Sequence, residues 1–283
     1  VAHERPCGKI LESEGEWPMV RWYFCLLLWR AASEDDESLS DVALLQQSLG
    51  LQRTRDSLCQ RESCTPAVFI VTSGRTGSTT LMHMLNLIPG YDIKGENLNL
   101  ASDIYDMHQE RESDWKTYKS STLYAWHHSN ARNDSEIDCS MRMMVMAELN
   151  PDPNARVVGF RASSWRFDND LQDLELLLKV FPCAKVVLSY RKELEDQLLS
   201  QSYALGDFQW YVTVEANQAM ENFAARHPEK TFSLALEDFG VERFNQLLGF
   251  LGEDACRYVR MLHDNEGRHF TKTTELAQDV IRC

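Results

Sequence analysis

Four short runs of apolar and β-branched residues are spaced along the chain after residue 62. They cover residues 67–71 (AVFIV), 157–160 (VVGF), 185–190 (KVVLSY) and 232–236 (FSLAL). A continuous apolar run of this length is typical of a strand whose two faces are both covered by helices. Between two of these runs, the leucines of residues 171–181 recur at helical spacing. This alternation predicts a three-layer α/β fold with a central parallel sheet.

The first 62 residues have a different pattern. Residues 17–29 (WPMVRWYFCLLLW) are mostly apolar, but Arg21 interrupts them and they fall short of the ~20 residues that a spanning helix needs. Residues 33–41 (SEDDESLSD) form an acidic, serine-rich run that cannot bury apolar surface. We therefore expect an N-terminal helical extension and acidic linker over residues 1–62, with no membrane span, and one catalytic domain over residues 63–283.

A glycine-containing turn follows the first predicted strand. Gly74 and Gly77 bracket it, and a helix with three hydroxyl side chains in its first turn follows (Ser78, Thr79 and Thr80). Glycines let the backbone approach an anion closely, and the first amides of a helix have no partner within the helix. Arg75, between the glycines, adds a guanidinium that can hold two oxygens of such an anion. The segment therefore predicts an anion-binding turn at the carboxyl end of a strand.

The turn lacks the GxxxxGK[ST] spacing and the lysine of a nucleoside-triphosphate P-loop. The string VTSGRTGSTTL instead resembles the 5′-phosphosulfate loop of sulfotransferases that use PAPS (3′-phosphoadenosine 5′-phosphosulfate), a family with a P-loop NTPase-like fold. The resemblance implies that one run of residues binds the 5′-phosphosulfate, namely Gly74, Arg75, Thr76, Gly77, Ser78, Thr79 and Thr80. It also implies that Arg75 offsets the charge on the phosphate oxygen that leaves sulfur.

A second anion site is predicted where the strand of residues 185–190 ends. Arg191 follows that strand and Ser200 lies on the next helix, so both can converge on a phosphate at the sheet edge. The string YRKELEDQLLSQ resembles the 3′-phosphate motif of the same family, most closely in its bacterial-type and carbohydrate-type branches. A register one residue later would pair Lys192 with Ser200. The string NEGRHFTK resembles the loop that closes over the nucleotide, which makes Arg268 a candidate contact to the 3′-phosphate or the adenine.

Glu96 is the candidate for the catalytic base. It lies where the second strand should end, and a carboxylate there can take the proton of an attacking acceptor. Carbohydrate-type sulfotransferases carry a glutamate at a similar station, so the resemblance implies the same role. The alternatives are His83, in the helix after the turn, and His127-His128, in the aromatic stretch LYAWHH. A solvated loop carboxylate or a helix cap is the purely structural alternative for Glu96.

Arg161 and the pair Ser163-Ser164 follow the strand of residues 157–160. They are predicted to lie at the same sheet edge, because parallel strands end together there. Contact with acceptor or donor and an ordinary structural role are both open for them.

Charge and cysteine usage narrow the choice of partners. A formal charge of −14 opposes binding to nucleic acid, which depends on lysine and arginine displacing counterions. The eight cysteines show no CxxC pair and no Cys/His ligand spacing, so no metal site is expected. We expect buried or free thiols, with a Cys59–Cys64 disulfide as the alternative in an oxidising compartment. The cytoplasm and the Golgi lumen both stay open.

Together these features predict an enzyme that transfers a sulfuryl group from PAPS to a hydroxyl or amine and releases PAP (adenosine 3′,5′-bisphosphate). The expected acceptor is a carbohydrate or another small molecule, with Glu96 as base and Arg75 at the departing oxygen. No metal is required, because the donor carries no triphosphate to neutralise. A P-loop-type phosphotransferase and a non-catalytic nucleotide-binding module are the alternatives, and a homodimer is left open.

Overall fold

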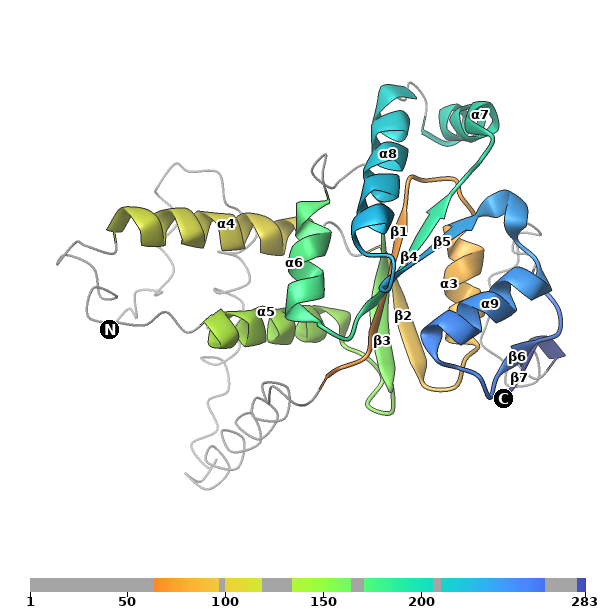
Figure 1. Ribbon diagram of the computed structural model, residues 1–283, viewed down its shortest axis with the longest axis horizontal. Coiled ribbons are helices and arrows are strands. Elements are labelled where there is room, and N and C mark those ends of the chain that lie inside the picture. Colours follow the sequence, from red (N-terminus) through yellow and green to blue (C-terminus); the bar gives the residue numbers. More distant parts are fainter. Residues whose placement is uncertain (1–63, 97–99, 119–133, 164–170, 206–209, 263–278) are drawn as a thin grey trace, which may run out of the picture. The chain divides into compact units, whose positions relative to one another are not determined.

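The structure of the chain is a computed structural model that describes residues 64–96, 100–118, 134–163, 171–205, 210–262 and 279–283 (Figure 1). The expected extension over residues 1–62 lies outside this part of the chain, as do His127, His128, Ser164 and Arg268. Their predicted roles stay predictions. No helix within the described ranges is long and apolar enough to cross a membrane.

Five parallel strands form the central sheet, in the order β2-β3-β1-β4-β5. The strands are β1 (Ala67–Thr72), β2 (Tyr91–Glu96), β3 (Val157–Ser163), β4 (Lys185–Tyr190) and β5 (Thr231–Ala235). The first strand lies in the middle; β2 forms the edge on one side and β3 returns between β2 and β1, after which β4 and β5 are added on the other side. Such a reversal marks the place where parallel α/β sheets bind ligands, beyond the carboxyl ends of the strands. All four predicted apolar strands are confirmed, as is a strand that ends at Glu96.

Helices cover both faces of this sheet (Figure 1). One face carries α3 (Ser78–Asn86) and α9 (Val241–Leu251). The other face carries α4 (Leu100–Tyr118), α5 (Asp134–Leu149), α6 (Gln172–Val180) and α8 (Trp210–Arg226). A further helix, α7 (Leu194–Leu205), follows β4, and a short 3₁₀ turn (Leu236–Asp238) follows β5. The predicted three-layer α/β architecture is therefore confirmed.

The position of β1 in the middle of the sheet explains why its sequence is apolar without interruption. Phe69 belongs to the core between the sheet and α4, α5, α6 and α8, where its ring lies 4.9 Å from that of Phe160. Val68 and Ile70 belong to the core on the opposite face, beneath α3 and α9. Since successive side chains of a strand point to opposite faces, both alternating sets must be apolar when both faces are covered.

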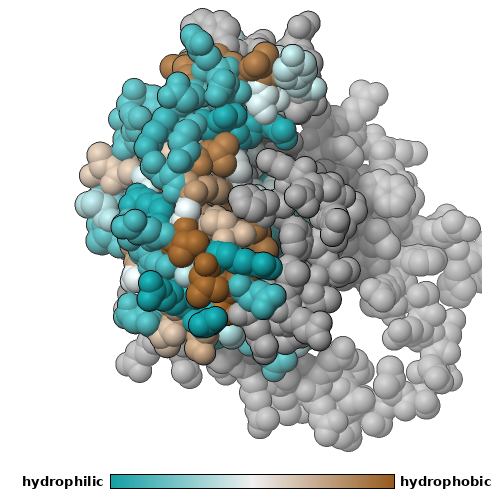
Figure 2. All heavy atoms as spheres, turned by 90° about the vertical axis from the view of Figure 1, so that its right-hand side faces the viewer, coloured by the Kyte–Doolittle hydropathy of each residue, from teal (hydrophilic) through white to brown (hydrophobic). Residues whose placement is uncertain are grey.

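Helix α9 has an apolar face toward the sheet and a polar face toward water. In α9, Phe244, Leu247 and Leu248 are buried against the sheet. Figure 2 views the side of the domain that carries this helix; among its coloured residues hydrophilic ones predominate, and the hydrophobic ones gather near the middle of the coloured part. This matches the amphipathic pattern expected of a helix with one face in water.

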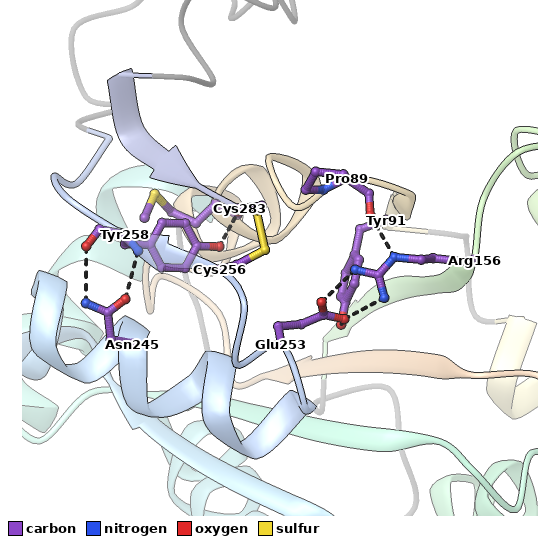
Figure 3. The surroundings of a disulfide bond; sticks show 9 residues. Pro89, Tyr91, Arg156, Asn245, Glu253, Cys256, Tyr258 and Cys283 are labelled. Atoms are coloured by element: carbon purple, nitrogen blue, oxygen red, sulfur yellow. Dashed lines mark hydrogen bonds and ion pairs between the residues drawn. A yellow bond between two sulfur atoms is a disulfide. The ribbon is translucent and has the colours of Figure 1, made fainter.

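A bidentate ion pair braces the amino ends of β2 and β3 (Figure 3). Arg156, just before β3, donates to both carboxylate oxygens of Glu253 at 2.7 and 2.6 Å and to the carbonyl oxygen of Pro89 at 2.8 Å. The hydroxyl of Tyr91 donates to the same carboxylate at 3.0 Å. The hydrogen bonds from Arg156 hold the pKa of Glu253 below its usual value, against the opposing effect of burial. Burial and the nearby Glu253 charge raise the pKa of Tyr91.

Residues 279–283 lie near this ion pair and are held there by strand pairing and by hydrogen bonds of the neighbouring Tyr258 (Figure 3). Arg257–Tyr258 (β6) and Ile281–Arg282 (β7) form a small antiparallel pair. The hydroxyl of the fully buried Tyr258 donates to the carbonyl oxygen of Met84 in α3 at 2.7 Å. Asn245 of α9 accepts from the Tyr258 amide at 2.7 Å and donates to its carbonyl oxygen at 3.1 Å. Both polar clusters lie away from the carboxyl ends of the strands, so we interpret them as structural.

Disulfides join segments that are distant in sequence. Cys64 pairs with Cys183 across 119 residues, Cys256 pairs with Cys283 across 27 residues, and Cys139 is also disulfide-bonded. The expectation of free thiols is wrong for these cysteines, and Cys64 does not pair with Cys59. Sequence spacing could not reveal the partner, because Cys64 and Cys183 are brought together by the pairing of β1 with β4, whose amino ends they precede.

Candidate active site

The turn between β1 and α3 has an unusual backbone. Gly74, Arg75 and Gly77 all have positive φ angles, of 83°, 54° and 73°. Glycine adopts this region readily, whereas Arg75 does so against the steric preference of a side chain with a Cβ. At Gly77, a Cβ atom would lie 2.6 Å from a methyl of Leu236 and 3.0 Å from the ring of Phe239. The sequence therefore needs glycine at residue 77 for both conformation and space.

This backbone leaves a row of amides without protein partners. The first hydrogen bond of the helix runs from the Leu81 amide to the Gly77 carbonyl oxygen at 3.0 Å. Within the described part of the chain, no acceptor is found for the amides of residues 75–80. Unpaired amides at the start of a helix, combined with the helix dipole, favour an anion. A turn of this shape can accommodate phosphate or sulfate oxygens, as predicted from the sequence.

The side chains of the turn point in different directions. Thr76 is fully buried, and its hydroxyl lies 2.6 Å from the Thr72 hydroxyl and 2.8 Å from the Ser189 hydroxyl. It faces the sheet, so only the Thr76 amide is available to a ligand. Thr79 is exposed, Thr80 is half-buried and Ser78 is buried. Of the hydroxyls predicted to bind the phosphosulfate, that of Thr79 is therefore the most accessible.

Arg75 reaches from the turn to α7. Its Nε donates to the Ser200 hydroxyl at 3.0 Å, although the two residues are 125 positions apart. A cavity of about 390 Å³ opens there, lined by Arg75, Arg191, Asp196, Leu199, Ser200 and Tyr203. The structure thus brings together the predicted residues of both anion motifs. Lys192, the alternative partner of Ser200, does not line this cavity and instead pairs with Asp238 at 2.5 Å.

Arg191 is held by acidic residues on both sides. Its guanidinium lies 3.6 Å from the Asp196 carboxylate and 3.5 Å from that of Glu237. Glu237 also accepts from the backbone amide of Lys192 at 3.0 Å. Partial burial acts to raise the pKa of Glu237, but hydrogen bonds from backbone amides and Arg191 lower it overall. Glu237, in the turn after β5, therefore orients Arg191 and stays charged near neutral pH.

Glu96 lies at the end of β2, beside the start of α3. A bulge between Lys94 and Glu96 shifts the register, so Glu96 stands opposite Arg161 of β3. Its carboxylate accepts from the Ser163 hydroxyl at 2.9 Å and lies 3.4 Å from the Arg161 guanidinium. Bulges commonly redirect a side chain in this way. The bulge therefore places Glu96 and Arg161 on the same face.

Arg161 links this carboxylate to the anion-binding turn. It donates to the Thr79 hydroxyl at 2.6 Å. Residues that follow β1 and β4 and residues at the ends of β2 and β3 thus meet at one edge of the sheet. His83, an alternative base, lies in the last turn of α3, at the helix end remote from the unpaired amides.

Sequence reasoning missed several polar residues behind the turn. Gln197 and Gln201 of α7 are fully buried and donate to the backbone of Ser73 and Gly74. Glutamine is common on helix surfaces, so its identity alone gave no signal. The one available sign was their four-residue spacing around Ser200, which places them on one side of the helix. No group of residues able to hold a metal ion occurs in the described ranges.

The family of this chain follows from a sequence comparison with known families, and several solved structures are similar to it. Similar solved structures include the sulfotransferase domain of the Synechococcus PCC 7002 olefin synthase (15% identity, 77% of this chain and 88% of that chain covered, TM-score 0.41). Sulfotransferase STF1 from Mycobacterium tuberculosis H37Rv is also similar (13% identity, 84% and 77% covered, TM-score 0.39). No curated protein matches the chain. The sequence model of the Sulfotransferase family matches residues 66–248. The chain therefore belongs to the sulfotransferase family.

Proposed function

We propose that this sulfotransferase uses PAPS as donor and transfers its sulfuryl group to a hydroxyl or amine of a carbohydrate or small-molecule acceptor. One observation carries the proposal. Arg75 extends from a turn with unpaired amides to a cavity lined by Arg191 and Ser200. Two anion-binding sites joined in this way suit a nucleotide with a 5′-phosphosulfate and a separate 3′-phosphate, whereas a nucleoside triphosphate carries its phosphates in one chain.

In the proposed reaction, the acceptor oxygen or nitrogen attacks sulfur in line with the bond to the 5′-phosphate. A new bond to sulfur forms, the bond between sulfur and the bridging oxygen breaks, and PAP leaves with the electron pair. Arg75 and the helix amides stabilise the charge on that oxygen. Glu96 accepts the acceptor proton. The hydrogen bond from Ser163 and the ion pair with Arg161 support this role, since they hold the carboxylate beside the turn.

The donor carries no triphosphate, so the arginines and amides can supply the positive charge. We expect turnover to survive EDTA, and dependence on a metal ion would favour the phosphotransferase alternative. A carbohydrate acceptor follows from the resemblance to carbohydrate-type members. The disulfides favour the lumenal alternative for its location, because such bonds persist in oxidising compartments.

The experiment is a labelled-PAPS transfer assay against a panel of glycans and small alcohols and amines. Wild-type protein should label at least one acceptor. Glu96→Gln should lower kcat by about 10²–10⁴-fold, the range of a general base. Glu229→Gln, at an exposed carboxylate, is the matched control and should leave kcat unchanged. PAP binding without labelling of any acceptor would instead support the non-catalytic module.

A further inference from the structure

Four polar residues from α7 and α8 form a buried network behind the anion-binding turn. Gln197 donates to the Gly74 carbonyl oxygen at 2.8 Å and to the Ser73 hydroxyl at 2.8 Å. Gln201 donates to the Ser73 carbonyl oxygen at 2.9 Å. Thr213 and Asn217 of α8 complete the network. Gln197, Gln201 and Thr213 are no more than 1% exposed, so water cannot replace these contacts.

The network fixes the direction in which the backbone of the turn faces. In a trans peptide, the carbonyl oxygen and the following amide hydrogen point in opposite directions. Because Gln197 draws the Gly74 carbonyl toward α7, the Arg75 amide is turned away from α7. Gly74 has a positive φ angle, a conformation that a free loop would adopt only part of the time. The hydrogen bond from Gln197 holds Gly74 in this conformation.

The second helix fixes the orientation of the glutamine amides. A side-chain amide can present either its oxygen or its nitrogen, and only the nitrogen can donate to a carbonyl. The Thr213 hydroxyl donates to Oε1 of Gln201 at 2.8 Å, and Nδ2 of Asn217 lies 3.5 Å from Oε1 of Gln197. Both oxygens are thus engaged by α8, which leaves the nitrogen atoms for the turn.

The same helix also carries the other anion site. Ser200 lies between the two glutamines in sequence but contacts Arg75 in the cavity. One rigid element therefore holds the backbone of the first site and supplies a side chain to the second. Any shift of α7 would move both sites together, and loss of the glutamine contacts would release one from the other.

We propose that Gln197 and Gln201 are positioning residues that set the separation between the 5′-phosphosulfate and 3′-phosphate sites. They thereby make the protein selective for nucleotides that carry both groups. This inference rests on the proposed function, because it takes PAP as the ligand. Two sites whose spacing is fixed beforehand bind one nucleotide more tightly, because less freedom is lost on binding.

The test is the selectivity ratio, the Kd of adenosine 5′-monophosphate divided by the Kd of PAP, measured by calorimetry. Gln197→Met and Gln201→Met keep the length of the side chain but remove the donor. Each should lower the ratio by about tenfold, the order expected for one buried hydrogen bond. Thr213→Val keeps the shape at α8 and should lower it by about threefold. Gln218→Met, at an exposed glutamine of α8, is the matched control and should leave it unchanged.

If Gln197 and Gln201 only stabilise the fold, their replacement should change the amount of folded protein and not the selectivity ratio. Partial unfolding would lower the number of binding sites found by calorimetry, while the ratio in the folded molecules stays as in the wild type. An unchanged ratio in both glutamine variants therefore overturns the inference and leaves the proposed function intact. If the wild-type protein itself does not prefer PAP, the proposed function fails and the inference fails with it.

Discussion

Replacing Gly77 with alanine tests whether the turn has the backbone described above. The residue has φ of 73°, and a left-handed backbone costs an ordinary residue about 1–2 kcal/mol. The new methyl would also lie 2.6 Å from Leu236 and 3.0 Å from Phe239, and overpacking of this kind costs about 1–3 kcal/mol. Gly77→Ala should therefore destabilise the protein by about 2–5 kcal/mol if the turn keeps its shape.

The matched control is Gly252→Ala at the end of α9. Gly252 has φ of 84°, but a Cβ there meets nothing within 4 Å. Urea denaturation should show a loss of about 1–2 kcal/mol for this variant, from the backbone alone. Calorimetry at a temperature where both variants are folded should find weaker PAP binding for Gly77→Ala only. Equal stabilities for the two variants, together with wild-type PAP binding by both, would refute the geometry of the turn.

Three further predictions concern Arg161, the ion pair between Arg156 and Glu253, and the disulfide of Cys64. Arg161→Met removes the ion pair that holds Glu96 and should lower kcat/KM in the labelled-PAPS assay by about 10–100-fold, as for a lost charge-assisted hydrogen bond, with PAP affinity changed less than about threefold; a parallel loss of PAP affinity would instead place Arg161 at the donor. Wild-type stability should fall as the pH drops through the lowered pKa of Glu253, because protonation of that carboxylate removes its ion pair with Arg156. Arg156→Ala should flatten this part of a stability profile measured by urea denaturation, and an unchanged profile would contradict the ion pair's role. Cys64→Ala should cost up to about 5 kcal/mol of stability, as the loop closed by its disulfide is long, and no change in the melting temperature would argue against the bond.

The sequence predicted the sheet well because β1 is buried on both faces, which requires an apolar residue at every position. The turn after it was also predictable, since Gly74 and Gly77 occur where a left-handed backbone is needed. Both features are local, so a short stretch of sequence contains the whole signal. The end of β2 at Glu96 could also be predicted, from its place shortly after the helix that follows the turn.

What the sequence did not reveal depends on residues distant in the chain. The buried face of Gln197 and Gln201 is defined by the turn after β1 and by α8, and neither glutamine differs in type from a solvent-exposed one. The bulge that places Glu96 opposite Arg161 depends on how β2 pairs with β3. The partner of Cys64 likewise follows from strand order. Such features appear only once the topology is known.

We propose that one pocket holds both charged ends of a bisphosphorylated nucleotide. Calorimetric titration with PAP and with ATP tests it most directly, using wild-type protein and Arg75→Met. We expect one PAP site per chain, tighter binding of PAP than of ATP, and PAP binding about 10–100-fold weaker in Arg75→Met. Tighter binding of ATP than of PAP, or PAP binding that is unaffected by loss of the Arg75 guanidinium, would contradict it.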